Sequence, residues 1–124
     1  MTINDPVKFC AGLWDWAILD GCFGETKIKP TDVDGLVERH GKFLVFETKS
    51  PGVSIPFGQT ITFKSMVSTG VFTIIVVWGE TNKPIKALLY TRHGETVYDP
   101  CDIDQFRKIV SQWFKYANSD FVPE

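Results

Sequence analysis

The stretch Val71–Trp78 constrains the fold of this chain most strongly. It is apolar throughout except for Thr73, and it is rich in β-branched residues. β-Branched residues favour strands, and an apolar run without alternation is typical of a strand buried on both faces. We therefore predict a central strand here. The run is far too short to cross a membrane.

A hairpin is predicted before this strand. Val33–Arg39 and Lys42–Thr48 are both rich in Val, Leu and Phe, and His40-Gly41 between them suits a tight turn. A three-residue turn with a bulge at Gly41 would shift the pairing by one residue, and the sequence leaves this alternative open. Later strands are expected at Ile85–Thr91 and, as a short extension of the sheet, at Glu95–Tyr98.

Three helices are expected around these strands. Asp5-Pro6 resembles a helix start, and apolar residues on more than one stripe predict a largely buried helix to about Leu19. Gln59–Ser68 is expected to be helical, although its several threonines leave a strand open. Asp102 and Gln105 form a capping-box pattern for the last helix. Its apolar stripe consists of Ile103, Phe106, Ile109, Val110, Trp113 and Phe114.

The element order predicts an α/β (α+β) fold with a mixed central sheet flanked by helices. The 124 residues, of which 44% are apolar, fit a single domain spanning residues 1–124. Trp14, Trp16, Trp78 and Trp113 are expected in the core rather than as platforms for stacking bases.

Charge and cysteine content narrow the function. The formal net charge of −2 argues against a protein that coats duplex DNA through bulk electrostatics, although an enzyme with a local basic rim is still allowed. Cys10, Cys22 and Cys101 form no CxxC pair, which argues against a structural zinc site. Sparse cysteines and no signal-peptide pattern favour a cytoplasmic location.

The hairpin carries the chemistry. A two-residue turn pairs Asp34 with Glu47, and Lys49 then lies on the same face as Glu47. Two opposed carboxylates repel each other, and Mg²⁺ or Mn²⁺ would compensate, since such cations accept one or two protein carboxylates. A simpler interpretation is that Asp34 caps a loop and that Glu47 and Lys49 lie at a solvated strand end, with Asp32 opposite Lys49.

A resemblance favours the metal site. Asp34 followed by Glu47-Thr48-Lys49 at the end of the next strand resembles the PD-(D/E)xK nuclease motif. The wider run, with Pro30 before Asp34 and Gly58-Gln59 after the hairpin, resembles small phage-type nucleases, and the spacing resembles archaeal Holliday-junction resolvases. The resemblance implies a restriction-endonuclease-like fold, in the order αβββαββα or close to it. The chain lacks the proline directly before Asp34.

The resemblance also implies roles for individual residues. Asp34 and Glu47 would bind the metal with the Thr48 carbonyl, while Lys49 would assist the nucleophile or the transition state. Gln59 would lie near the scissile phosphate, or it would be an ordinary helix residue.

An acid from the first helix often joins such sites. Asp15 is the candidate, with Asp20 behind it, and the alternative is an exposed acid on that helix. A basic rim for DNA phosphates would consist of Lys27, Lys29, Arg39, Lys42 and Lys64. The alternative is that these five side chains are simply solvated. His40 lies in a turn and His93 in another, and neither has an expected catalytic partner.

The expected activity is therefore that of a Mg²⁺- or Mn²⁺-dependent phosphodiester hydrolase, a deoxyribonuclease of the endonuclease kind. Its substrate would be duplex or branched DNA. A homodimer is expected, because cutting two antiparallel strands takes two sites. Two alternatives stay open: a catalytically silent module or inhibitor that keeps the nuclease fold, and an assembly component with an apolar surface.

Overall fold

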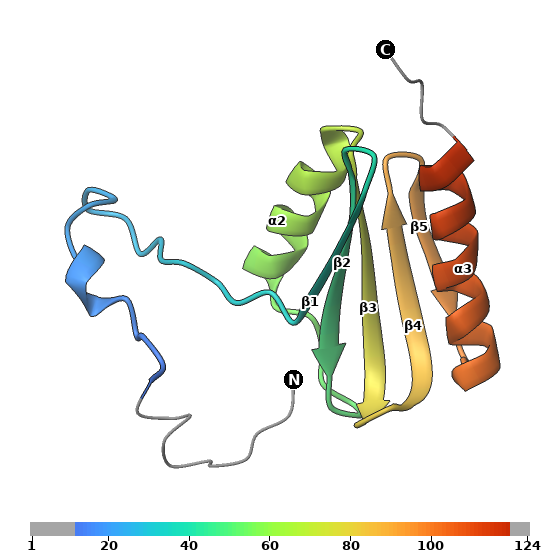
Figure 1. Ribbon diagram of the computed structural model, residues 1–124. Helices are drawn as coiled ribbons and strands as arrows, with labels where there is room; N and C mark the ends of the chain where they lie inside the picture. The colour runs from blue at the N-terminus through green and yellow to red at the C-terminus, as the bar shows by residue number, and fades with distance from the viewer. Residues whose placement is uncertain (1–11, 120–124) are drawn as a thin grey trace. The chain divides into compact units, whose positions relative to one another are not determined.

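The computed structural model describes residues 12–119 of the chain. The chain divides into two units, Met1–Asp32 and Val33–Glu124, which are described separately. The second unit contains the sheet and both α-helices of the described residues (Figure 1).

The second unit is a mixed α+β fold, as predicted. Its five strands lie in the order β1-β2-β3-β4-β5, and only β2 and β3 are parallel. A parallel pair needs a crossover, and helix α2 provides it. Two strands precede α2 and three follow it, so the order that the resemblance implies, with three strands before this helix and two after it, is matched only approximately. The bounds are β1 Gly35–Arg39, β2 Lys42–Lys49, α2 Phe57–Ser68, β3 Phe72–Glu80, β4 Lys83–Thr91, β5 Gly94–Tyr98 and α3 Ile103–Ser119.

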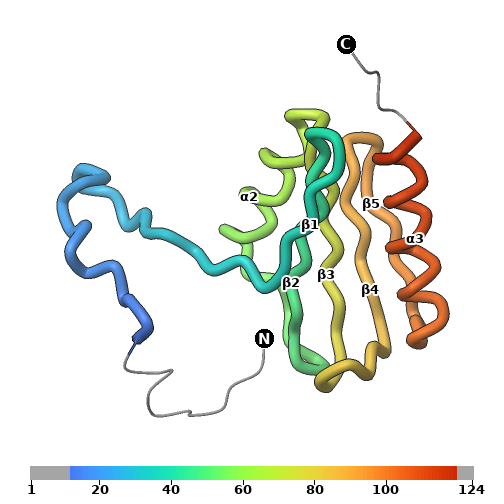
Figure 2. Tube along the Cα trace, in the orientation of Figure 1, coloured from blue at the N-terminus to red at the C-terminus, as the bar shows by residue number. Residues whose placement is uncertain are grey.

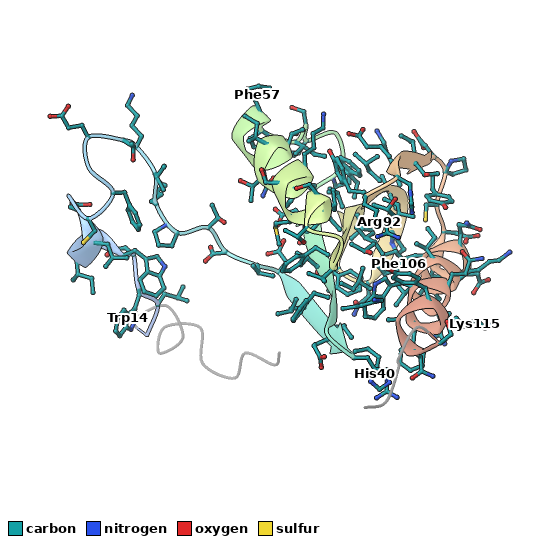
Figure 3. The ribbon with its side chains drawn as sticks, turned by 90° about the horizontal axis from the view of Figure 1, so that it is seen from above. Trp14, His40, Phe57, Arg92, Phe106 and Lys115 are labelled. Atoms are coloured by element: carbon teal, nitrogen blue, oxygen red, sulfur yellow. The ribbon has the colours of Figure 1, made fainter. Side chains whose placement is uncertain are left out.

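Helix α2 covers one face of the sheet and α3 the other (Figure 2), so the inner strands are buried on both faces while β1 and β5 are largely exposed. Strand β3 explains the apolar run, because its Ile74 and Val76 pack with α2 while Ile75 packs with α3. Helix α2 contributes Phe63 and Val67 to its cluster, so Gln59–Ser68 is helical as predicted and not a strand. Figure 3 shows the two helices on either side of the strands from above.

The hairpin has the predicted two-residue turn. His40 and Gly41 have φ values of 51° and 80°, and two positive φ angles are what the tight type I′ turn requires. The Glu38 carboxylate accepts a hydrogen bond of 2.8 Å from the Gly41 amide. The register pairs Arg39 with Lys42, as predicted, and the bulged alternative is wrong.

Helix α3 begins as its capping box predicts. The Asp102 carboxylate accepts a hydrogen bond of 2.8 Å from the Gln105 amide. Of the apolar stripe, Ile109 and Trp113 are buried, whereas Ile103 and Phe114 are 51% and 46% exposed. The Arg39 guanidinium lies over the Phe114 ring, 5.8 Å from its centroid. Across the described residues, no helix is both long and apolar enough to cross a membrane.

The first unit differs from the sequence prediction. The start of the predicted helix, including Asp5-Pro6, lies outside the described residues. Among the described residues of the first unit, only Ala17–Leu19 is helical, as the short 3-10 helix η1. The Asp15 carboxylate accepts a hydrogen bond of 2.9 Å from the Ala17 amide, and Trp16 has a left-handed φ of 65°. This local turn competes with an α-helix.

The aromatic residues of the first unit are exposed as a consequence. Trp14 and Trp16 are 67% and 40% exposed, so their predicted place in the core is wrong. They contact each other, with ring centroids 5.5 Å apart. Trp78 and Trp113 of the second unit are buried, as predicted.

The end of β3 makes a close backbone contact that tests this fold. At Gly79, φ is 155° and a Cβ would clash with the Lys83 carbonyl. We expect Gly79→Ala to lower the free energy of unfolding by about 1–3 kcal/mol, because both strain and the clash oppose it. Gly58→Ala is the matched control, because a Cβ there meets nothing within 4 Å and alanine favours the first turn of α2. Equal urea-unfolding curves for the two variants would contradict the close contact.

Candidate functional site

Glu47 is a nearly buried carboxylate at the end of β2. Side chains alternate along a strand, so Glu47 and Lys49 share the α2 face with the core residue Val45. The Lys49 Nζ lies 3.1 Å from Glu47 Oε1, and the two side chains are only 14% and 11% exposed. The alternative of a solvated strand end is therefore wrong for this pair.

Gln59 joins the pair from the first turn of α2, where it was predicted to be. Its Nε2 donates a hydrogen bond of 2.9 Å to Glu47 Oε1. The crossover makes this contact, because α2 starts close to the end of β2 before returning along the sheet to β3. The Gln59 Oε1 atom is buried and accepts no hydrogen bond from any described residue. An acceptor of this kind needs a hydrogen-bond donor or a cation.

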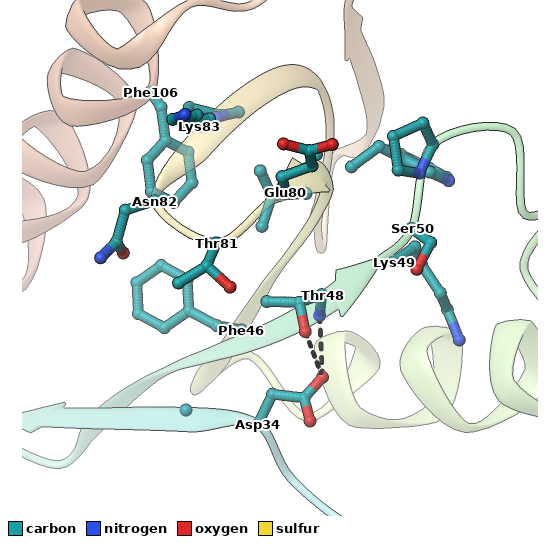
Figure 4. A pocket seen from close by; sticks show the side chains of 16 residues that line it. Asp34, Phe46, Thr48, Lys49, Ser50, Glu80, Thr81, Asn82, Lys83 and Phe106 are labelled. Carbon is teal, nitrogen blue, oxygen red and sulfur yellow. Dashed lines mark hydrogen bonds between the residues drawn. The ribbon is translucent and has the colours of Figure 1, made fainter. Parts of the chain in front are cut away.

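Asp34 lies just before β1 and contacts Thr48 rather than Glu47. Its Oδ2 accepts a hydrogen bond of 2.8 Å from the Thr48 amide and one of 3.1 Å from the Thr48 hydroxyl (Figure 4). The ladder between β1 and β2 ends at Gly35 and Phe46, one residue before the predicted pair of Asp34 and Glu47. The Asp34 carboxylate therefore accepts a hydrogen bond from the Thr48 amide just beyond the end of the ladder, in place of a backbone carbonyl.

Oxygen atoms that suit a hard cation lie in two neighbouring groups at the end of β2, one around Glu47 and one at the Asp34–Thr48 contact. The amide and carbonyl of one strand residue point to the same side, so the Thr48 carbonyl faces the edge where Asp34 lies. Asp34, Glu47, Thr48 and the unpartnered Gln59 Oε1 then offer carboxylate and carbonyl oxygens, the ligands that Mg²⁺ prefers. Residues 12–119 hold no cluster of three or more His, Cys, Asp or Glu side chains. A site here would therefore rest on two carboxylates and leave room for substrate and water.

The two acids predicted from the first helix belong to the first unit. No α-helix carries Asp15, which instead caps η1 through the Ala17 amide, so the predicted helical setting is wrong. Asp20 follows η1 directly and is exposed.

The proposed basic rim does not form around the cluster. Arg39 and Lys42 lie at the turn of the hairpin, which is about 23 Å along β2 from Lys49 at ~3.3 Å per residue. There the Arg39 Nε donates a hydrogen bond of 2.8 Å to Asn118, and the Lys42 Nζ lies 5.4 Å from the Tyr116 ring centroid.

The remaining basic candidates are also away from the cluster or belong to the other unit. Lys64 pairs with Glu95 at 3.8 Å on the exposed surface. Lys27 and Lys29 belong to the first unit. His93 lies in the turn between β4 and β5 and accepts a hydrogen bond of 3.3 Å from Arg92.

A cavity beside Asp34 was missed by the sequence analysis. It has a volume of about 750 Å³ and opens between the ends of β2 and β3 and the first turns of α3 (Figure 4). Its lining includes Asp34, Phe46, Thr48, Thr81, Asn82, Lys83 and Phe106. Three segments far apart in the sequence build it. No local pattern in the sequence therefore marks it.

The hydrogen bonds of Asp34 give a test that needs no activity. An Asn side chain keeps an oxygen acceptor for Thr48, whereas Ala removes it. We expect Asp34→Ala to lower the free energy of unfolding in EDTA by about 1–2 kcal/mol, and Asp34→Asn to lower it by about half as much or less. Urea denaturation measures both. An equal loss in the two variants would show that hydrogen bonding to Thr48 is not what stabilises this edge.

A match to a known protein would assign these residues independently, but no protein-family model, curated protein or solved structure matches the chain. Functional roles for Asp34, Glu47, Lys49 and Gln59 are therefore proposals, supported by their geometry, their chemistry and the motif resemblance.

Proposed function

We propose that this chain is a nuclease that hydrolyses phosphodiester bonds in DNA with Mg²⁺ or Mn²⁺. The observation that carries the proposal is the convergence of Lys49 and Gln59 on the nearly buried Glu47, next to the Asp34–Thr48 contact. The resemblance of Asp34 and Glu47-Thr48-Lys49 to the PD-(D/E)xK motif supports the same activity.

Asp34, Glu47 and the Thr48 carbonyl are the proposed metal ligands. Asp34 Oδ2 is occupied by Thr48, so its Oδ1 is the atom offered to the cation. When bound, the cation would acidify a water molecule and neutralise the negative charge that develops on the phosphoryl oxygens. Gln59 fixes one oxygen of Glu47, and this leaves the other oxygen for the cation.

Lys49 would act on the reacting atoms directly. Its ammonium has three N–H donors, of which Glu47 engages one. The others would orient the attacking water or stabilise the phosphoryl oxygens in the transition state. In the reaction the water oxygen bonds to phosphorus, the phosphorus–oxygen bond to the leaving nucleotide breaks, and the water proton ends on the leaving oxygen through solvent.

A cytoplasmic location and a homodimer are part of the proposal. Cys22 is exposed and unpaired, and Cys101 is buried and unpaired, which suits a reducing compartment. Burial and, secondly, the charge of Asp102 raise the pKa of the Cys101 thiol, which keeps it protonated. Two antiparallel strands need two sites for an endonuclease to cut both, and a two-fold dimer supplies them.

Variants at the cluster test the activity. We expect wild-type protein to cleave plasmid DNA in Mg²⁺ and not in EDTA. Glu47→Gln, Asp34→Asn and Lys49→Met should each lower the rate at least about 100-fold, because each removes charge at the reacting phosphate. Glu95→Gln is the matched control, because it breaks the exposed pair with Lys64 and should retain the full rate. Equal cleavage by all variants would identify a contaminant and remove the proposal.

The catalytically silent module has one observation in its favour. Glu47 already has a cationic partner in Lys49 and a donor in Gln59, so its charge is balanced without a metal. Calorimetric titration of the folded protein with Mn²⁺ separates the two functions. Heat of binding that is lost in Asp34→Asn favours the nuclease, whereas no binding to the wild type favours the module.

A further inference from the structure

We propose that the cavity beside Asp34 receives an unpaired nucleotide next to the scissile phosphate. The preferred substrate would then be DNA with unpaired bases, such as a single-stranded tail or a flap, rather than a continuous duplex. The inference rests on the proposed function for the position of the phosphate. We call this space the Phe46–Phe106 cavity after its two rings.

The cavity borders the proposed catalytic cluster at Asp34, Thr48 and Lys49, whereas Glu47 and Gln59 are not among its lining residues. Asp34 and Thr48, which make the hydrogen bonds of the cluster edge, also line the cavity (Figure 4). A strand whose phosphate lies at Asp34 would therefore place an adjoining nucleotide at the cavity mouth. The volume of about 750 Å³ lies within the range typical of ligand pockets, roughly 300–1,000 Å³, and has room for a base with its sugar.

The walls of the cavity suit a planar aromatic base. The rings of Phe46 and Phe106 have centroids 6.1 Å apart and meet edge to face at 61°. Both rings also pack against the core cluster on the α3 face, so each offers a base only the part of its ring that lines the cavity. Aromatic side chains of this kind hold unpaired bases by stacking, largely without regard to base identity.

The rim of the cavity adds polar groups from the turn between β3 and β4. Thr81, Asn82 and Lys83 are all exposed there. An Asn amide can pair with the polar edge of a base, and a Lys ammonium can contact a backbone phosphate. Asn82 has a left-handed φ of 59°, so this turn has a defined shape.

The charge of the chain limits its attraction to the backbone of any DNA, so short-range contacts must supply the preference for unpaired DNA. With a net charge of −2, the protein gains little from bulk attraction to a duplex backbone. Affinity must then come from short-range contacts such as stacking. A paired base has its faces covered and reaches a cavity only by extrusion, which is unfavourable. An unpaired base enters without that penalty.

Binding in EDTA tests the cavity without catalysis. Fluorescence anisotropy would compare a single strand, a blunt duplex and the same duplex with an unpaired tail. We expect wild-type protein to bind the tailed duplex at least about tenfold more tightly than the blunt duplex. Phe106→Leu should abolish most of this preference, because leucine keeps an apolar side chain against the core but has no ring. Phe43→Leu, a half-buried phenylalanine elsewhere on β2 that stacks on Phe72, should retain the preference.

A second variant keeps the test valid if Phe106→Leu does not fold. Asn82→Gly keeps the left-handed backbone of an exposed turn and removes only the amide. It should weaken binding of the tailed duplex severalfold and leave blunt-duplex binding unchanged. Equal binding of tailed and blunt DNA by wild-type protein, or an unchanged preference in both variants, would overturn the inference.

Cleavage assays keep this inference separate from the proposed function. If Mg²⁺-dependent cleavage requires Glu47 but acts equally on blunt and tailed DNA, the nuclease stands and the cavity proposal is wrong. If no DNA is cleaved but Phe106→Leu loses the preference for tails, the cavity proposal stands as a binding site and the catalytic role is wrong.

Discussion

The two-residue turn at His40-Gly41 is the constraint on which the site depends. Its positive φ angles set the register of β1 against β2, and in a strand a shift of one residue moves every side chain to the opposite face. In the observed register, Glu47 and Lys49 face α2. One residue of slippage in β2 would turn both charges toward the α3 core and leave Glu47 without Gln59. The turn therefore selects which face of the sheet carries the charged cluster.

The parallel pairing of β2 and β3 supplies the rest of the cluster. A parallel neighbour requires a crossover, and the crossover helix α2 carries in its first turn the glutamine that binds Glu47. The charges of the cluster residues also depend on one another. A nearly buried carboxylate is stable only with partners, and Lys49 and Gln59 provide them. Asp34 adds a second negative charge nearby, and the proposed cation would offset it.

The sequence predicted the parts of the fold that depend on local pattern. The apolar run of β3 and the His40-Gly41 turn led to the correct central strand and hairpin register. Over residues 12–19, the described part of the first predicted helix, the prediction was wrong because the Asp15–Ala17 hydrogen bond, a local side-chain contact, outweighs apolar periodicity. The hydrogen bond between Asp34 and Thr48 was not predictable, since it depends on the residue at which the pairing of β1 with β2 ends. The Phe46–Phe106 cavity needs three distant segments, so no local pattern could show it.

Crystals grown or soaked with Mn²⁺ would test the central claim most directly, because anomalous scattering locates the ion without any assay of activity. The account predicts a peak bound by Asp34 and Glu47 at about 2.0–2.3 Å from their oxygens, with the Thr48 carbonyl as a further ligand. It also predicts that the peak disappears in Asp34→Asn. Ordered carboxylates with no peak between them at saturating Mn²⁺ would contradict the claim that this hairpin holds a catalytic cation.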